Sequence, residues 1–186
     1  AVREFYGAAE ASFITLAGPD APADSVGAPY PGVQIAVRGG AVWVKSPYLF
    51  DRYAGADPGG AVWDQGWLSV GEIGRLEAGY LHLSGRAGRM VTVADQNVFP
   101  EEIEAFIATL PGVARVAVLP RPDALRGVVL VAVILGESAQ EAAILAAGRA
   151  AFGPLKAPRA VIWRSDWPVL AAGKTDLRAL EASLWP

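Results

Sequence analysis

Up to about residue 85, hydrophobic and polar residues alternate in short runs. The runs GVQIAVRGG, AVWVKS, GWLSVGEIGRLE and GYLHLSG cover residues 32–40, 41–46, 66–77 and 79–85. Alternation with a period of two places hydrophobic side chains on one face of an extended chain, and the glycines between the runs favour turns. This part of the pattern predicts short antiparallel strands joined by turns.

After about residue 90, the hydrophobic positions follow a different rhythm. In PEEIEAFIATL (100–110), Ile103, Phe106, Ile107 and Leu110 share one helical face, and a proline followed by two glutamates is typical of a helix start. The segments that follow predict two β-branched strands, an alanine-rich helix begun by Ser138, a short strand and a last helix with Thr175 as its N-cap; they cover residues 112–120, 126–136, 138–153, 159–164 and 175–184.

The change of rhythm predicts an α+β protein with two parts. A mostly β part covers residues 1–85, and a small α/β unit covers residues 90–186. Residues 86–89 connect the two, so we expect the break between the units there.

Composition narrows the possible functions. The chain has 186 residues, of which 53% are hydrophobic, so it can bury a sizeable core. Its net charge is −3 without a basic stripe, which argues against a nucleic-acid partner. The absence of cysteine excludes disulfides and thiolate metal sites. The only histidine, His82, argues against a histidine-based triad or zinc cluster. Because it alternates with two leucines, we expect it at an outward strand position.

The apolar runs are of strand length and well below the about 18 residues of a membrane-spanning helix. We therefore expect no membrane span and a cytoplasmic protein. The chain begins with Ala1 rather than methionine, which leads us to expect a fragment or a processed chain.

Lys174 stands among small residues just before the predicted last helix. One interpretation is a solvated surface lysine, as most lysines are. The alternative is a cation placed to meet an anionic ligand, since helix N-termini attract anions. The GKT triplet does not form a phosphate-binding P-loop, because the glycine that this motif requires five positions before Gly173 is replaced by Pro168.

Several segments in a fixed order carry a resemblance to a known family. The segments FYGAAE, GWLSVGEIG, GRAGRMVTVADQNVFPEEIE, GPLKAPRAVIW and WPVLAAGKTDLRAL begin at residues 5, 66, 85, 153 and 167. Together they resemble the adenylate-forming superfamily of acyl-CoA synthetases, peptide-synthetase adenylation domains and luciferases. The similarity runs from about Phe5 to the end of the chain.

The resemblance implies the C-terminal portion of a two-domain enzyme. The end of a large domain that binds ATP and a carboxylic acid would be followed by a small, mobile lid domain. Such enzymes form an acyl-adenylate and pyrophosphate, and then pass the acyl group to the thiol of coenzyme A or of a carrier-protein pantetheine. The implied cofactors are ATP and Mg²⁺. Because the family's Ser/Thr/Gly-rich phosphate loop is absent, we expect these 186 residues alone to be inactive.

The resemblance also implies roles for individual residues. Tyr6 would pack on adenine, Glu10 would hold Mg²⁺ through the phosphates, and Glu72 would accept hydrogen bonds from the ribose hydroxyls. Arg86 would lie near the ribose and phosphates, and Lys174 would reach the acid carboxylate and the α-phosphate. The residues alone leave a core tyrosine, a helix-start glutamate and a surface arginine open as alternatives.

Three positions depart from the family's pattern. Gly88 stands at the hinge position, where the family usually has Asp or Lys, although glycine's wide φ/ψ freedom suits a pivot. Residues 93–95 (Val-Ala-Asp) replace a pair of glycines that lie near the pantetheine arm. Ala9 replaces a threonine. These departures keep two alternatives open: an adenylation enzyme that loads a carrier protein, and a degenerate homologue that binds a nucleotide or a partner without catalysis.

Overall fold

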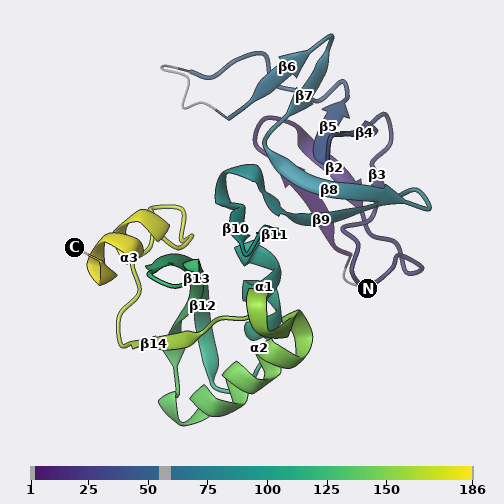
Figure 1. Ribbon diagram of the computed structural model, residues 1–186. Coiled ribbons are helices and arrows are strands. Elements are labelled where there is room, and N and C mark those ends of the chain that lie inside the picture. The colour runs from purple at the N-terminus through teal and green to yellow at the C-terminus, as the bar shows by residue number, and fades with distance from the viewer. Residues whose placement is uncertain (1–2, 55–59, 186) are drawn as a thin grey trace. The chain divides into compact units, whose positions relative to one another are not determined.

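The structure, a computed structural model, describes residues 3–54 and 60–185. The chain divides into two units, Ala1–Gly88 and Arg89–Pro186 (Figure 1). The division lies within the short 3₁₀ helix η1 (Ala87–Arg89).

The first unit consists of antiparallel strands. β1 (Phe5–Ala8), β2 (Ser12–Leu16) and β3 (Ala28–Pro29) form a small sheet in the order β1-β2-β3. A larger sheet has the order β6-β7-β5-β8-β9, with β4 paired to β5; its strands are β4 (Gln34–Arg38), β5 (Ala41–Lys45), β6 (Val62–Asp64), β7 (Trp67–Ser69), β8 (Glu72–Glu77) and β9 (Tyr80–Arg86). The alternating runs thus form strands as predicted. Their buried side chains form one core with residues from the first sheet and its turn; its members are Ala11, Ile14, Val33, Val42, Val44, Leu68 and Leu81.

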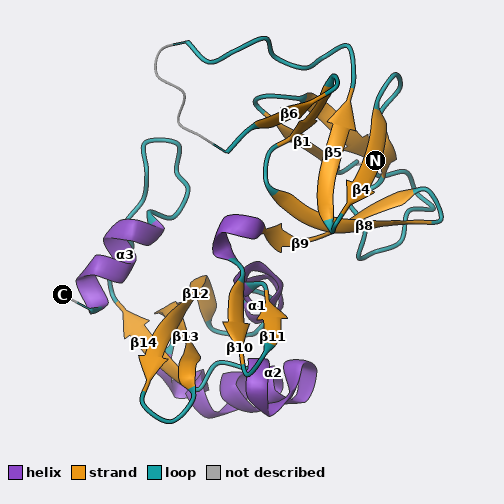
Figure 2. Ribbon diagram, turned by 45° about the horizontal axis from the view of Figure 1, so that its top comes forward, coloured by secondary structure: helices purple, strands orange, loops and turns teal. Residues whose placement is uncertain are grey.

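The second unit is a three-stranded sheet covered by helices. β12 (Val113–Asp123) pairs antiparallel with β13 (Gly127–Gly136), which pairs parallel with β14 (Ala160–Arg164) (Figure 2). The remaining elements are the β10–β11 hairpin (Val91–Val93, Gln96–Val98), α1 (Pro100–Ile107), η2 (Ser138–Gln140), α2 (Glu141–Lys156) and α3 (Leu177–Leu184). The α+β class predicted from the sequence is confirmed.

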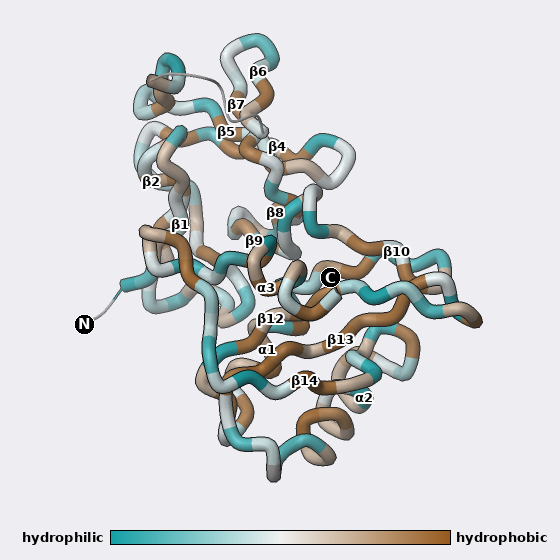
Figure 3. The backbone as a smooth tube through the Cα atoms, turned by 90° about the vertical axis from the view of Figure 1, so that its left-hand side faces the viewer, coloured by the Kyte–Doolittle hydropathy of each residue, from teal (hydrophilic) through white to brown (hydrophobic). Residues whose placement is uncertain are grey.

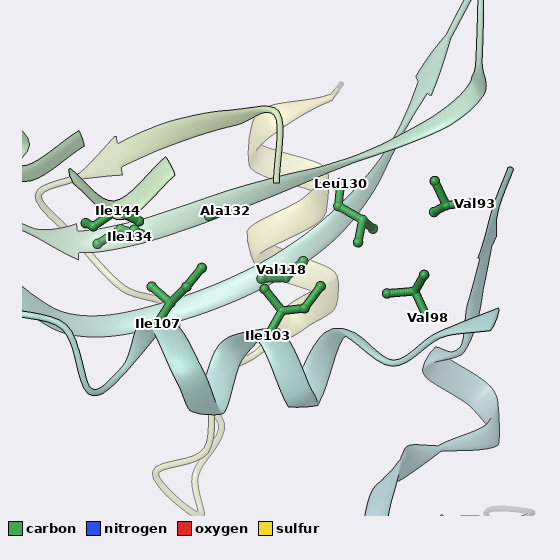
Figure 4. Close-up of a cluster of buried hydrophobic side chains, with 9 residues drawn as sticks. All are labelled: Val93, Val98, Ile103, Ile107, Val118, Leu130, Ala132, Ile134 and Ile144. Atoms are coloured by element: carbon green, nitrogen blue, oxygen red, sulfur yellow. The ribbon is translucent and has the colours of Figure 1, made fainter. Parts of the chain in front are cut away.

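Side-chain alternation along the central strands gives this sheet two buried faces. Val118 points into a core with Ile103 of α1 and Ile144 of α2 (Figure 4). Its neighbour Leu119 points to the opposite face, where Leu180 of α3 is fully buried. Burial on both faces explains why β13 is a continuous hydrophobic run, visible as the brown stretch at β13 in Figure 3.

Two local predictions were wrong. Asp176, not Thr175, caps α3: its carboxylate accepts a hydrogen bond from the Ala179 amide at 3.0 Å. His82 is not exposed, contrary to what we expected of an outward strand position: it is 4% exposed, because side chains including Asp24, whose Oδ2 lies 3.0 Å from its Nδ1, cover it. The predicted helix from Ser138 also begins with a separate 3₁₀ turn and continues to Lys156 through a kink at Gly153.

Candidate active site

Four of the residues singled out from the sequence interact in the first unit. Burial raises the pKa of the Tyr6 hydroxyl well above its ordinary value, the carboxylates of Glu72 and Glu10 raise it further, and Arg86 opposes them. Tyr6 and Glu72 line one apolar space and Arg86 is hydrogen-bonded to Glu72, so these three side chains lie close together, and Glu10 is near enough for its charge to act on the Tyr6 hydroxyl. The sequence predicted each residue separately, and the fold brings the four into one cluster.

Strand register explains the pairing of Glu72 and Arg86. Glu72 opens β8, Arg86 closes β9, and the two residues are direct partners in the antiparallel ladder. Arg86 Nε donates to Glu72 Oε1 at 3.0 Å. The Glu72 side chain is 9% exposed, whereas that of Arg86 is 61% exposed. The arginine therefore neutralises a buried carboxylate while much of its guanidinium remains accessible to an anionic ligand.

A small apolar space, too narrow to hold a water molecule, adjoins this ion pair. Tyr6 and Glu72 supply its polar groups, and hydrophobic residues supply the rest; the lining is Tyr6, Ala11, Ile14, Val42, Val44, Leu68, Val70 and Glu72. Most of these apolar residues belong to the buried core of the first unit, so the space itself is not a ligand cavity, and Tyr6 and Glu72 stand at its polar edge.

Glu10 lies in the turn between β1 and β2 and is partly exposed. Tyr53 Oη donates to its Oε1 at 2.9 Å, and its backbone carbonyl accepts from the Phe50 amide at 2.8 Å. Within residues 3–54 and 60–185, no cluster of three or more metal-ligating side chains is present. A single carboxylate of this kind fits a Mg²⁺ ion that is bound mainly by substrate phosphates, and does not fit a closed protein metal site.

Lys174 lies in the second unit, after a tight turn. Its backbone carbonyl accepts from the Leu170 amide at 2.8 Å, and Gly173 makes the turn with a φ of 78°. Its side chain is exposed and has no ion pair or hydrogen bond within the described part of the chain. Because Asp176 places its own carboxylate at the start of α3, the helix end is not a ready anion site, and Lys174 itself supplies the accessible positive charge.

Comparison with known proteins identifies the family. The model of the AMP-binding enzyme C-terminal domain matches residues 102–174, a span that ends at Lys174. Residues 102–174 belong to the family of AMP-binding enzyme C-terminal domains, and the chain as a whole resembles the adenylate-forming superfamily. It is 32% identical to the acyl-CoA ligase YhfT of Bacillus subtilis, whose activity is uncharacterized, covering 92% of this chain and 38% of that relative. It is also 32% identical to a 2-succinylbenzoate–CoA ligase of Lactococcus lactis, covering 88% and 36% respectively.

Solved structures of adenylate-forming enzymes share the fold. The amide bond synthetase McbA from Marinactinospora thermotolerans matches with a TM-score of 0.81 and 28% identity over 97% of this chain. ATP-bound MatB from Rhodopseudomonas palustris matches with a TM-score of 0.80 and 30% identity over 98% of this chain. The chain covers 42% and 40% of these two structures, so it corresponds to less than half of each enzyme.

Two of the positions that depart from the family's pattern have a left-handed backbone conformation. Ala94 and Asp95 form the two-residue turn of the β10–β11 hairpin with φ values of 47° and 61°. This left-handed conformation favours glycine, so the turn keeps a glycine-like backbone while it carries a methyl group and a carboxylate. Gly88, in contrast, has a negative φ, and an added Cβ would meet nothing within 4 Å. Its role as a hinge stays a prediction.

Sequence reasoning missed Tyr53 and Arg89. Tyr53 contacts Glu10 from 43 positions away, and no local pattern around it indicates that contact. Arg89 follows the hinge position and binds Glu104 with both ends of its guanidinium, at 2.9 and 2.7 Å.

Among the described residues, no helix combines the length and apolar character needed to cross a membrane.

Proposed function

We propose that the chain is part of an ATP-dependent, AMP-forming acid–thiol ligase that resembles acyl-CoA synthetases. The observation that carries this proposal is the cluster of Tyr6, Glu10, Glu72 and Arg86, together with an exposed, unpaired Lys174 at the end of the matched family domain. The named CoA ligases among the relatives support the reaction class. The co-substrates would be a carboxylic acid and the thiol of coenzyme A or pantetheine. The reaction would take place in the cytoplasm.

In this mechanism the first unit binds the nucleotide. The Tyr6 ring packs on adenine, and the buried Glu72 accepts hydrogen bonds from the ribose hydroxyls. Arg86 pairs with Glu72 and presents its exposed nitrogens to phosphate oxygens. Glu10 would hold Mg²⁺, which would neutralise phosphate charge when bound.

Lys174 acts in the adenylation step. Attack of a carboxylate oxygen on the α-phosphorus forms the acyl–phosphate bond, and the bond to pyrophosphate breaks. Two anions approach each other in this step, so a cation between them lowers their repulsion and stabilises charge on the phosphoryl oxygens. Gly88 would allow the second unit to present Lys174 for this step and withdraw it for thiol transfer.

Acid-dependent exchange of radiolabelled pyrophosphate into ATP tests the proposal. We expect the full-length gene product to catalyse exchange with at least one acid of a carboxylic-acid panel, and the 186-residue chain alone to catalyse none, since it lacks the family's phosphate loop. ATP binding without exchange by any acid would instead support a degenerate homologue. Exchange by the 186 residues alone would overturn the proposal that the active site also needs a phosphate loop outside these residues.

The β10–β11 turn favours a second candidate, an enzyme that loads a carrier protein. Asp95 is exposed and places a negative charge where the family has glycine. Coenzyme A carries more phosphate charge than a carrier-bound pantetheine, so this carboxylate disfavours coenzyme A more. Thioester formation with coenzyme A, compared with a phosphopantetheinylated carrier protein, separates the two acceptors.

A further inference from the structure

Two hydrogen bonds tie the Glu10 turn to a distant segment of the first unit. The amide of Phe50 donates to the Glu10 carbonyl at 2.8 Å, and the hydroxyl of Tyr53 donates to the Glu10 carboxylate at 2.9 Å. The first bond fixes the backbone of the turn, and the second fixes one carboxylate oxygen. The other oxygen, Oε2, accepts no hydrogen bond from the described residues.

The Tyr53 ring is itself held by aromatic contacts. It packs edge-on against Phe50 with ring centroids 4.7 Å apart, and Phe50 stacks on Trp63 at 5.9 Å. Phe50 also packs against the hydrophobic core of the first unit. This row of rings connects the Tyr53 hydroxyl to the rigid part of the unit, so the hydroxyl is in place before any ligand arrives.

Solvation alone does not require this contact. Glu10 is only partly buried, and water can satisfy a carboxylate in such a turn. A free glutamate side chain would populate several rotamers, whereas the hydrogen bond selects one. The selected rotamer leaves one oxygen engaged and one oxygen available, which is the arrangement of a carboxylate that meets a cation on a single side.

We propose that Tyr53 is a positioning residue that orients the Glu10 carboxylate toward Mg²⁺ bound to the ATP phosphates. This inference rests on the proposed function, because it requires the first unit to bind ATP. Groups that hydrogen-bond a metal-binding carboxylate orient it, and their loss typically lowers metal affinity or activity by about 10–100-fold. Because Tyr53 acts through Glu10, its loss affects the metal-dependent part of ATP binding and spares the rest.

The test measures ATP affinity by calorimetry on the full-length gene product, without acid, in excess Mg²⁺ and in EDTA. Tyr53→Phe removes the hydroxyl and keeps the ring against Phe50. We expect this variant to lower the gain in ATP affinity given by Mg²⁺ by about 10-fold and to leave metal-free ATP affinity unchanged. The matched control is Tyr48→Phe, whose hydroxyl donates to the Pro31 carbonyl at 3.3 Å and has no contact with Glu10. It is expected to behave like the wild type in both conditions.

A double-mutant comparison identifies the route of the effect. If Tyr53 acts through Glu10, Tyr53→Phe has no further effect on the Mg²⁺-dependent gain in a Glu10→Gln background. Equal gains in Tyr53→Phe and Tyr48→Phe, or fully additive losses in the double variant, overturn the inference while the proposed function stands. Failure of the wild type to bind ATP overturns the proposed function and the inference with it.

Folding is checked separately. Thermal unfolding of Tyr53→Phe is compared with that of Tyr48→Phe. If Tyr53→Phe does not fold, Glu10→Asp provides the second variant, because the shorter side chain keeps the charge and withdraws it from the Tyr53 hydroxyl. An unchanged Mg²⁺-dependent gain in Glu10→Asp also contradicts the inference.

Discussion

Replacement of Lys174 by alanine is expected to slow acid-dependent ATP–pyrophosphate exchange by about 10²–10³-fold in the full-length gene product, roughly 2.7–4 kcal/mol of transition-state stabilisation. The Lys174 side chain is exposed and has no ionic or hydrogen-bonding partner among the described residues, so its charge is available to a ligand. Two hydrogen bonds hold the turn that precedes it, from the Leu170 amide to the Lys174 carbonyl and from the Gly173 amide to the Leu170 carbonyl, and they keep the backbone in place when the side chain is removed. Loss of the cation should therefore remove charge stabilisation without disturbing the fold.

The measurement compares the two half-reactions. Lys174→Ala is assayed for exchange, and separately for transfer of a synthetic acyl-adenylate to the thiol, which should remain near the wild-type rate. Arg178→Ala serves as the matched control, because Arg178 is also an exposed cation but lies on α3 beyond the Asp176 cap. Wild-type exchange in Lys174→Ala would make Lys174 an ordinary surface lysine. An equal fall in both half-reactions would point to damaged folding or docking.

The pattern of hydrophobic residues predicted most of the secondary structure, because it reflects which side chains are buried. Ile103 and Ile107 lie on the predicted face of α1 and are both 1% exposed. The alternating runs form β4, β5, β7, β8 and β9. In each case a local period matches the geometry of one element, so a window of about ten residues contains the information.

The errors arose where a distant residue decides the outcome. His82 alternates correctly with its neighbours, but Asp24 and Arg75 cover the face that was expected to meet water; their side chains lie 3.0 and 3.2 Å from its Nδ1. The cap of α3 was misplaced by one residue because Thr175 and Asp176 are both good caps. The structure uses the Thr175 hydroxyl to accept from Trp167 Nε1 at 2.9 Å instead.

The candidate site shows the same limit. Sequence motifs pointed to Tyr6, Glu10, Glu72 and Arg86, but strand register and burial determine that they interact. Tyr53 carried no local signal, since its hydrogen bond to Glu10 exists only after the chain folds. The side chains that support a site are thus harder to find than the residues of the site itself.

Arg89→Ala is expected to destabilise the second unit by about 2–3 kcal/mol, because it leaves carboxylates without their cation in a largely buried place. The Arg89 guanidinium binds both oxygens of Glu104 and lies 3.4 Å from Glu101 Oε1. Both Glu101 carboxylate oxygens are buried and accept no hydrogen bond within the described part of the chain. Burial opposes the charge on Arg89, yet its bonds and attraction to Glu104 and its attraction to Glu101 hold its pKa above the ordinary value.

Hydrogen exchange of the buried β13 amides measures this loss in the second unit alone. Arg164→Ala provides a matched control: its side chain is 18% exposed, close to the 22% of Arg89, but its partner Asp166 is 73% exposed, whereas Glu104 is 18% exposed. An arginine of similar burial is thus removed in both variants, and only Arg89→Ala leaves buried carboxylates without a cation, although Glu104 Oε1 keeps the hydrogen bond from the Val118 amide at 2.7 Å. We expect Arg164→Ala to cost about 1 kcal/mol or less, since an exposed carboxylate is resolvated by water. Equal losses in the two variants would mean that lost packing of the arginine stem, rather than the unpaired carboxylates, sets the cost.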